Sequence, residues 1–327
     1  MTKPAVTKSM RLLQLEALLL THPAGLSQAE IARRLGVNRS TINRYVADLP
    51  GHVYIDEQDG GRWKIDRQAY LVNVCFSLDE AMAIHLATRL LTTRMDRQNP
   101  HAAAALRKLG LALEKLAPRI SQHMQQSADV IDAPYQRKDP NFLRTLETLT
   151  LAWAQQRKVK IWHRHEGGTI KEYVFAPYFL EPYAVGQAIH AIGWREPPDA
   201  LRTLKVERID RVELLREGYA IPEDFDPGEL LADAWGIWYT EEEPVRVVLK
   251  FSRQAAGRVK ETRWHRSEQV SELEDGGLVW EARIASTTEM LPWIRGWGAE
   301  VEVLEPEELR QQLMKETEEQ YRIYHKG

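Results

Sequence analysis

The stretch from Leu26 to Leu49, LSQAEIARRLGVNRSTINRYVADL, restricts the fold of this chain more than any other. Ser27 precedes Glu30 by three residues, and this capping-box spacing predicts that a helix begins here. Gly36 is placed to end that helix in the left-handed conformation that glycine tolerates, and Asn38 is suited to cap the next helix. Two short helices joined by a turn of three or four residues with a glycine are typical of the helix-turn-helix.

The second of these helices is predicted to have one apolar and one polar face. Ile42, Val46 and Leu49 are spaced i, i+4, i+7, which places them on the side that packs against a core. The opposite side carries short polar residues and arginines, which can reach base edges and phosphates in the major groove. The residues predicted to contact DNA from this helix are Arg39, Ser40, Thr41, Asn43 and Arg44. The alternative interpretation is a helical hairpin that serves only packing, with its arginines in solvent.

A β-hairpin is predicted directly after this helix. Val53–Ile55 and Trp63–Ile65 alternate in character around Asp59-Gly60-Gly61, which is a turn signal. A hairpin in this position corresponds to the wing of a winged helix-turn-helix. We expect Arg62 and Lys64 to contact DNA phosphates from the wing.

The charge of the chain is unevenly distributed. The formal net charge is -3, yet residues 1–66 contain nine Lys and Arg against seven Asp and Glu, whereas residues 241–327 contain thirteen against eighteen. The acidity therefore lies far along the chain from the predicted DNA-contacting helix. A net charge of +2 over the first 66 residues gives limited non-specific affinity for DNA, so two copies acting together are expected.

Composition favours a soluble cytoplasmic protein of two or three domains. The 327 residues are 43% hydrophobic and 28% charged, which fits globular domains rather than a disordered or fibrous chain. No apolar run approaches the roughly 20 residues that span a bilayer. Arg11, Gln14 and Glu16 interrupt the leucine-rich N-terminus, which predicts an amphipathic helix rather than a signal peptide. Cys75 is the single cysteine, so no internal disulfide is expected and a cysteine-based metal site is disfavoured.

Two further helices are expected in the middle of the chain. One begins with the capping box of Ser77 and Glu80, and the next runs from near His101 to just before Pro118. These helices are interpreted either as a linker with a self-association surface or as simple packing against neighbouring domains. Residues 123–140, HMQQSADVIDAPYQRKDP, lack periodicity and are predicted to form a loop.

A helix followed by short strands is predicted next. The helix covers residues 141–157, and the strands cover 158–165, 170–183, 187–194 and 201–215, with a turn at Glu166-Gly167-Gly168. Short strands at such close spacing are typical of a small barrel.

Four pieces of this region match the pattern of a known domain. They are Val159-x-Ile161, Ala176 to Leu180, Ile189 to Gly193, and Arg202 to Ile209. On these pieces the region resembles a WYL domain, an Sm/SH3-like barrel that follows winged helices in bacterial transcriptional regulators. Ile189, His190 and Ala191 stand where the family has its naming Trp-Tyr-Leu tripeptide. The resemblance therefore implies the fold of a WYL domain. The replaced tripeptide leaves the identity of the ligand open.

The C-terminal part of the chain carries a second resemblance. A strand, a helix and a pair of strands precede Trp293 to Gly298, and Pro306 to Arg310 form a final Pro-x-x-Leu-Arg. This layout is similar to the extension that follows WYL domains, so the resemblance covers nearly the whole chain.

Cations are concentrated on the last predicted strand of the barrel. Arg202, Lys205 and Arg208 lie on it, with His190 on a neighbouring strand. Strand alternation would place Arg202 and Arg208 on one side and Lys205 on the other, unless a bulge intervenes. Paired arginines have a fork geometry that suits phosphates.

Aromatic side chains near these cations could stack on bases. They include Trp162, His163, Tyr173 and Tyr178. The resemblance implies that the barrel binds nucleic acid or a nucleotide-like effector, and the residue types agree. The predicted effector-binding residues are His163, Tyr178, His190, Arg202, Lys205 and Arg208. The alternative is that Arg202 and Arg208 form surface ion pairs with Glu172, Glu207 or Asp210.

No catalytic site, metal or cofactor is expected. His163 and His165 would share one strand face, but no third ligand stands at a recognisable spacing. The sequence contains no nucleophile elbow, Walker loop or GxGxxG motif. We therefore expect that the protein is not an enzyme.

The sequence as a whole predicts an α+β multidomain protein. The expected domains are a winged helix-turn-helix over residues 1–66, a helical linker over 67–140, a WYL effector-binding domain over 141–240, and a small α/β C-terminal extension over 241–327. The expected function is a homodimeric transcriptional regulator that binds a double-stranded DNA operator and responds to an anionic effector, either single-stranded nucleic acid or a nucleotide. The alternative is a non-transcriptional nucleic-acid-binding accessory protein, for example in DNA repair or phage defence.

Overall fold

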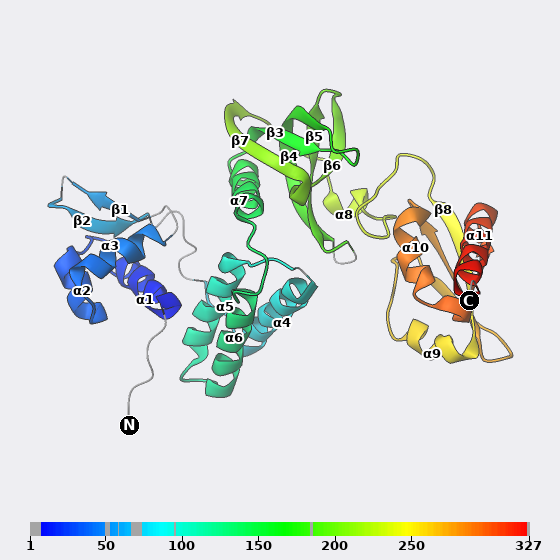
Figure 1. Cartoon of the computed structure of the whole chain (residues 1–327), viewed down its shortest axis with the longest axis horizontal. Coiled ribbons are helices and arrows are strands. Elements are labelled where there is room, and N and C mark those ends of the chain that lie inside the picture. The colour runs from blue at the N-terminus through cyan, green and yellow to red at the C-terminus, as the bar shows by residue number, and fades with distance from the viewer. Residues whose placement is uncertain are drawn as a thin grey trace. The chain divides into compact units, whose positions relative to one another are not determined.

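The computed structural model describes residues 8–49, 53–57, 59–66, 74–94, 96–183 and 186–325 (Figure 1). The chain forms two compact units, Met1–Lys138 and Asp139–Gly327, each with hydrophobic cores of its own. No helix within the described ranges is long and apolar enough to cross a membrane.

The first unit begins with a helix-turn-helix. Its elements are α1 (Lys8–Leu20), α2 (Gln28–Leu35), α3 (Arg39–Ala47), β1 (Val53–Asp56) and β2 (Arg62–Ile65). The predicted capping box is confirmed, because the Ser27 side chain accepts from the N–H of Glu30 and the Glu30 carboxylate accepts from the N–H of Ser27. Gly36 ends α2 with a φ of 65°, as its position in the sequence predicted. Asn38 is the N-cap residue of α3, but its side chain makes no capping hydrogen bond.

The apolar side of α3 is fixed by a core shared with α1 and α2. Ile42 and Tyr45 are buried, whereas Val46 and Leu49 are half-buried. The buried partners of α3 include Leu15, Leu19, Ile31 and Leu35. The core therefore settles which side of α3 faces solvent.

The predicted wing is also present. Strands β1 and β2 are antiparallel, with Val53 opposite Ile65 and Asp56 opposite Arg62. Gly60 and Gly61 both have positive φ, which is the reason for two glycines in this turn. An isolated bridge joins Leu26 to Trp63 and so ties the wing to the segment before α2.

A helical region follows the winged helix in the same unit. It consists of α4 (Leu78–Arg94), α5 (Pro100–Leu113) and α6 (Pro118–Ile131). The expected loop over residues 123–140 is wrong in its first half, because α6 continues to Ile131. The buried face of α6 mixes small and hydroxyl residues with apolar ones, which conceals the helical period in the sequence. That face consists of Ser121, Met124, Ser127, Ala128 and Ile131.

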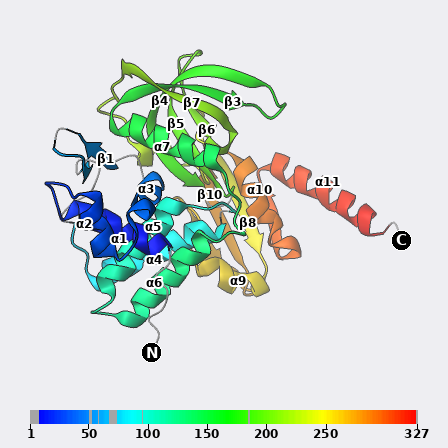
Figure 2. The same cartoon turned by 60° about the vertical axis from the view of Figure 1, so that its left-hand side comes forward.

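The second unit begins with a helix and a five-stranded sheet. Its elements are α7 (Pro140–Ala154), β3 (Arg157–Arg164), β4 (Ile170–Tyr183), β5 (Ala188–Glu196), β6 (Ala200–Lys205), the 3-10 helix η2 (Val206–Arg208) and β7 (Ile209–Gly218). The strand order is β6-β5-β4-β3-β7, and every pairing is antiparallel. Figure 2 shows α7 lying against the sheet, with Phe142, Thr145 and Leu149 on its buried face. Among the described residues no ladder pairs β6 with β7, so a closed barrel is not confirmed.

One predicted strand of this region is wrong. Residues 201–215 were expected to form a single strand, but η2 divides them into β6 and β7. These two strands lie at opposite edges of the sheet, since β6 pairs with β5 and β7 pairs with β3. No glycine or proline marks the break in the sequence.

The rest of the second unit forms a βαββαβ module with a C-terminal helix. After α8 (Pro227–Leu230), its elements are β8 (Val245–Phe251), α9 (Arg253–Lys260), β9 (Gln269–Glu272), β10 (Leu278–Ile284), α10 (Thr287–Arg295), the 3-10 helix η3 (Gly298–Glu300), β11 (Val301–Glu305) and α11 (Glu307–Tyr324). The sheet order is β11-β8-β10-β9, which together with the element order is the ferredoxin-like arrangement. The expected small α/β extension is thus present as a split βαβ fold.

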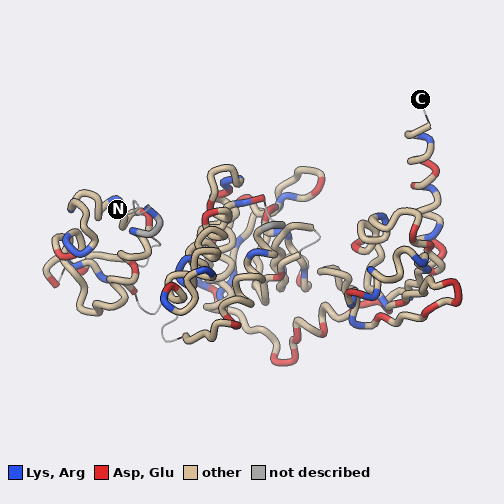
Figure 3. Tube along the Cα trace, turned by 90° about the horizontal axis from the view of Figure 1, so that it is seen from below, with Lys and Arg blue, Asp and Glu red and all other residues tan. Residues whose placement is uncertain are grey.

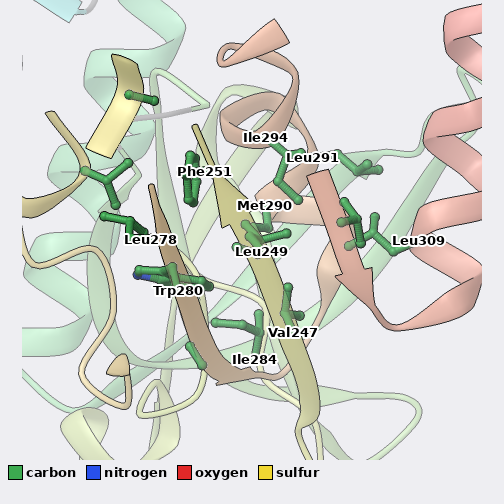
Figure 4. Packing of buried hydrophobic residues seen from close by; sticks show 14 of the residues in the cluster. Val247, Leu249, Phe251, Leu278, Trp280, Ile284, Met290, Leu291, Ile294 and Leu309 are labelled. Carbon is green, nitrogen blue, oxygen red and sulfur yellow. The ribbon is translucent and has the colours of Figure 1, made fainter. Parts of the chain in front are cut away.

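The core of this module lies between its sheet and its helices. Figure 4 shows Leu249 and Phe251 of β8, Trp280 of β10 and Met290 of α10 in contact within it. Leu309 anchors the start of α11, but the rest of that helix is exposed or half-buried. Figure 3 shows acidic and basic residues interspersed along α11, as expected for a solvated helix.

Candidate nucleic-acid interface and effector site

The exposed side of α3 carries the residues predicted to contact DNA. Arg39, Ser40, Asn43 and Arg44 are exposed, and Thr41 is half-buried. Because Ile42 and Tyr45 are buried on the opposite side, these polar side chains project together from one face of the helix. The arrangement fits a recognition helix, with arginines and an asparagine free to reach base edges or phosphates.

Gln28 was missed by the sequence analysis, yet it positions this surface. Its Nε2 donates to Asn43 Oδ1 at 2.7 Å and to the backbone carbonyl of Arg39 at 2.9 Å. Gln28 is therefore the link between the start of α2 and the polar side of α3. The sequence places Gln28 in the first turn of the first predicted helix. In a helix-turn-helix this turn lies near the start of the second helix, and this position could have indicated the contact.

The wing cations make contacts inside the domain. Lys64 Nζ lies 2.9 Å from Asp56 Oδ2 and 3.0 Å from Asp59 Oδ2, and its side chain is 19% exposed. The hydrogen bonds that Lys64 donates to Asp56 and Asp59 raise its pKa. Arg62 Nη1 donates to the carbonyl of Gly25 at 3.2 Å. Both side chains thus have partners within the winged helix, and their contact with phosphates stays a prediction.

The three cations expected on one strand are distributed differently. Arg202 lies within β6, Lys205 ends β6, and Arg208 ends η2. Arg202 pairs with Gly193 and Lys205 with His190, so alternation places Arg202 on the other face of the sheet from Lys205. The expectation that Arg202 and Arg208 share one side of a strand is therefore wrong, because Arg208 is not in a strand.

The η2 turn brings two predicted histidines to one place. Lys205, just before η2, pairs with His190 of β5, and Ile209, just after it, pairs with His163 of β3. Only the three residues of η2 separate these two pairings along the chain. Glu207 Oε1 accepts from the backbone N–H of Ile189 at 3.1 Å and so fastens η2 to β5.

Both histidines are buried, and three of their four ring nitrogens are buried without a hydrogen-bond partner. His163 is 6% exposed and His190 is 8% exposed. Neither ring nitrogen of His163 has a partner in the structure, nor does Nδ1 of His190. Unsatisfied buried polar atoms are uncommon in native proteins and call for an explanation such as an absent ligand.

Burial, assisted by the cations of this region, holds both histidines neutral. Burial lowers the pKa of His163 to about 4, assisted by His165, Arg208 and Arg195, while Asp210 opposes the shift. Burial also lowers the pKa of His190 to about 4, assisted by Lys205 and Arg208. Arg208 thus acts on both rings. We call His163, His190, Arg195, Lys205 and Arg208 the η2 site.

Arg195 is the member of the η2 site that the sequence analysis missed. Its guanidinium lies 4.5 Å from the centre of the Tyr173 ring, a cation–π contact. Tyr173 in turn shares a 2.8 Å hydrogen bond with Nε2 of His165. Phe175 pairs with both Val159 of β3 and Arg195 of β5. This alignment across three strands could not be read from the sequence without the register.

Tyr178 does not belong to the η2 site. It is buried in a core where its ring stacks with Tyr219 at 6.1 Å and contacts Phe225 edge-on at 5.0 Å. It also lines a shallow cavity of about 300 Å³ together with Trp194 and Tyr219. Its role in effector binding stays a prediction. The contacts of Tyr178 are with Tyr219 and Phe225 and not with the histidines of the η2 site.

Among the described residues, no group of three or more His, Cys, Asp or Glu side chains is arranged to hold a metal ion. Cys75 is exposed.

Family models match three parts of the chain. A model described as an HTH domain matches residues 11–52, one described as a WYL domain matches residues 144–214, and one described as a WCX domain matches residues 243–320. A comparison with curated proteins found no match.

Two solved structures show weak overall likeness. Proteasome accessory factor B/C of Arthrobacter aurescens is 20% identical with a TM-score of 0.30, over 93% of this chain and 47% of that chain. This chain therefore spans about half the length of the Arthrobacter protein. A CRISPR Cas-related protein is 7% identical with a TM-score of 0.40, over 78% of this chain and 75% of that chain. At these TM-scores neither likeness carries an argument.

Proposed function

The chain has the domain architecture of a WYL-domain transcriptional regulator, and from this premise we propose that it is a homodimeric regulator whose WYL module senses an anionic effector. The HTH domain implies that the protein binds DNA. The observation that carries the sensing proposal is the η2 site, where cations surround two buried neutral histidines. The effector class we propose is single-stranded nucleic acid or a nucleotide. The proposal includes no enzymatic step.

Strand connection supports the Sm/SH3-like barrel of the WYL module. The edge strands β6 and β7 belong to a five-stranded sheet, whose flat width would be about 19 Å at the usual spacing of strands. The three-residue η2 joins these edges, and the chain from Lys205 to Ile209 reaches at most about 14 Å. The sheet must therefore curl toward a barrel for the connection to be made.

Dimerisation is proposed from charge and from exposed apolar side chains. A winged helix with a net charge of +2 gains affinity when two copies occupy two half-sites of a palindrome. Leu86 and Leu90, one turn apart on α4, are 59% and 66% exposed, and Met314 and Tyr321, two turns apart on α11, are 56% and 61% exposed. Either helix offers an apolar surface to a second copy. Sedimentation of the full chain at micromolar concentration tests this, and a stable monomer both free and on DNA would contradict it.

The sensing proposal is tested by operator affinity with and without effector candidates. The candidates are short single-stranded DNA, short RNA and cyclic nucleotides, and a typical coupling changes operator affinity about 5- to 150-fold. An effector shifts the protein only if it binds one conformation better than another. We expect Arg208→Ala to abolish the response while leaving effector-free operator binding near that of the wild type.

Arg202→Ala is the matched comparison for this test. It removes an exposed arginine from β6. The alternation of side chains along β6 places Arg202 on the face of the sheet opposite to His190. We expect it to retain more of the response than Arg208→Ala. A full response in Arg208→Ala would place sensing elsewhere, and loss of effector-free DNA binding would make Arg208 structural.

A further inference from the structure

The residues of the η2 site include three cations, Arg195, Lys205 and Arg208, and no acid. Arg208 Nη2 is paired with Glu166 at 3.2 Å, but that glutamate side chain is 85% exposed, so its field is strongly screened. Asp210 is paired with Arg164. Arg195 and Lys205 add two further cations beside the histidines. An anion is the missing partner that would complete this arrangement.

The surroundings of His163 are cationic or neutral, apart from one acid. The buried face of the covering helix α7 is uncharged, consisting of Phe142, Thr145, Leu149 and Ala152. The titratable and charged groups around His163 are Arg164 and His165 on β3, Lys171 and Tyr173 on β4, Arg195 on β5, Arg208 on η2 and Asp210 on β7. Within this set Asp210 alone favours a charged imidazole.

The surroundings of His190 contain two acids. These are Glu181, its cross-strand neighbour on β4, and Glu207 on η2, whose carboxylate receives the N–H of Ile189. Burial raises the pKa of Glu181. The other groups around His190 are Tyr183 on β4, Lys205 on β6 and Arg208 on η2. Burial, assisted by Lys205 and Arg208, keeps His190 neutral in the absence of a ligand.

We propose that a phosphate group of the effector binds at η2 against Arg208 and that its binding drives protonation of His163 and His190. A phosphate reverses the sign of the local field, and an imidazolium can donate from both ring nitrogens, whereas a neutral imidazole donates from only one. The nitrogens that now lack partners would then become donors to the phosphate or its neighbours. The inference rests on the proposed function, because it takes the η2 site to be the effector site.

Protonation on binding makes affinity depend on pH in a defined direction. With a free pKa of about 4, both rings are neutral near pH 7, so a protonated bound state must take protons from solution. Each proton taken up strengthens binding about 10-fold for every unit that the pH falls. Two fully coupled histidines would therefore give about 100-fold tighter binding at pH 6 than at pH 7.

The probe is unphosphorylated tetrathymidylate, because its diester phosphates do not titrate in this range. Isothermal titration calorimetry of the full chain near pH 6.5, in buffers of different ionisation enthalpy, measures the protons taken up directly. We expect the wild type to take up protons on binding. We also expect Kd to depend on pH more steeply than protonation of the probe can explain. The same titration with 5′-phosphorylated tetrathymidylate and with inorganic phosphate distinguishes an internal diester from a terminal or free phosphate.

Three variants assign the protons. We expect His163→Gln and His190→Gln each to lower the uptake by up to one proton, while His325→Gln, at the exposed end of the chain, leaves it unchanged. Binding of any probe without proton uptake by the wild type overturns the proposal, as does uptake that is undiminished in both glutamine variants. Absence of binding by every probe overturns it as well. Proton-coupled binding that leaves operator affinity unchanged would contradict the sensing function but not this inference.

Discussion

The two polar surfaces assigned to nucleic acid are built in opposite ways. The surface of α3 comes from one helix of nine residues, and four of its five predicted contact residues are exposed. The η2 site draws residues from β3, β5, β6 and η2, and its histidines are almost completely buried. A helix surface needs the rest of the fold only as a support, whereas the η2 site exists only when the sheet is formed. The comparison therefore predicts that acidification destabilises the second surface and leaves the stability of the first unchanged.

Acidification is expected to separate the two surfaces most strongly. Between pH 6.5 and 4 the unfolded chain protonates His163 and His190 but the folded chain does not, so stability is lost as the pH falls and levels off below pH 4. At pH 5 the loss is about 2 kcal/mol for each histidine. Hydrogen exchange of peptides from β3 and β5 measures this loss at pH 7 and pH 5.

The double variant His163→Gln/His190→Gln provides the reference for that experiment. We expect its β3 and β5 peptides to lose about 4 kcal/mol less protection on acidification than those of the wild type. Peptides from α3 should behave alike in both proteins. An equal pH response of β3 and β5 in the variant and the wild type would mean that other groups control acid stability.

Substitutions on α3 test the exposed surface by itself. Arg44→Ala and Asn43→Ala are each expected to weaken operator binding by about 1–3 kcal/mol, or about 5- to 150-fold, because each removes a base or phosphate contact. A gel-shift titration at fixed salt measures the change, and Arg322→Ala on α11 is the control. Effector affinity should stay unchanged. If both α3 variants bind the operator like the wild type, the recognition helix is misassigned.

The same contrast explains which features were predictable from the sequence. The helix-turn-helix depends on local signals, so Ser27, Gly36 and Ile42 were sufficient to predict its helices and its buried side. The α6 helix was missed because Ser121 and Ser127 occupy buried positions where the pattern requires apolar residues. The local sequence decided both outcomes. It made the helix-turn-helix predictable, and it concealed α6.

The η2 site was only partly predictable for a different reason. Lys205 and Arg208 were predicted as cations on one expected strand, His190 as a neighbour on the next strand, and His163 as a ring for stacking. The structure places all four near η2. Arg195 was missed and Arg202 lies on the other face, because strand register and the η2 break decide both positions. Register depends on pairing between distant segments, and a single sequence without turn residues at the break does not specify it.

Gln28 positions the exposed surface of α3 from the start of α2. Its removal should therefore weaken operator binding less than the removal of Arg44 or Asn43. Gln28→Ala deletes the hydrogen bonds to Asn43 and to the Arg39 carbonyl, and we expect about 1 kcal/mol weaker operator binding. In the double variant with Asn43→Ala the two effects should not add, since Gln28 acts largely through Asn43. Additive effects in a gel-shift double-mutant cycle would show instead that Gln28 makes a contact of its own.

The wing gives the smallest expected effect on DNA binding. Lys64 belongs to the DNA-binding domain, but it is already paired with two acidic side chains. Its Nζ lies within 3.0 Å of both Asp56 and Asp59, so a phosphate would have to displace carboxylates that neutralise it. We therefore expect Lys64→Ala to weaken operator binding less than about threefold, below the effect of Arg44→Ala. The decisive measurement is the slope of log affinity against log salt concentration. A true phosphate contact contributes about one unit to that slope, so an unchanged slope in Lys64→Ala confines the lysine to the wing hairpin, and a slope reduced by about one places it on the DNA backbone.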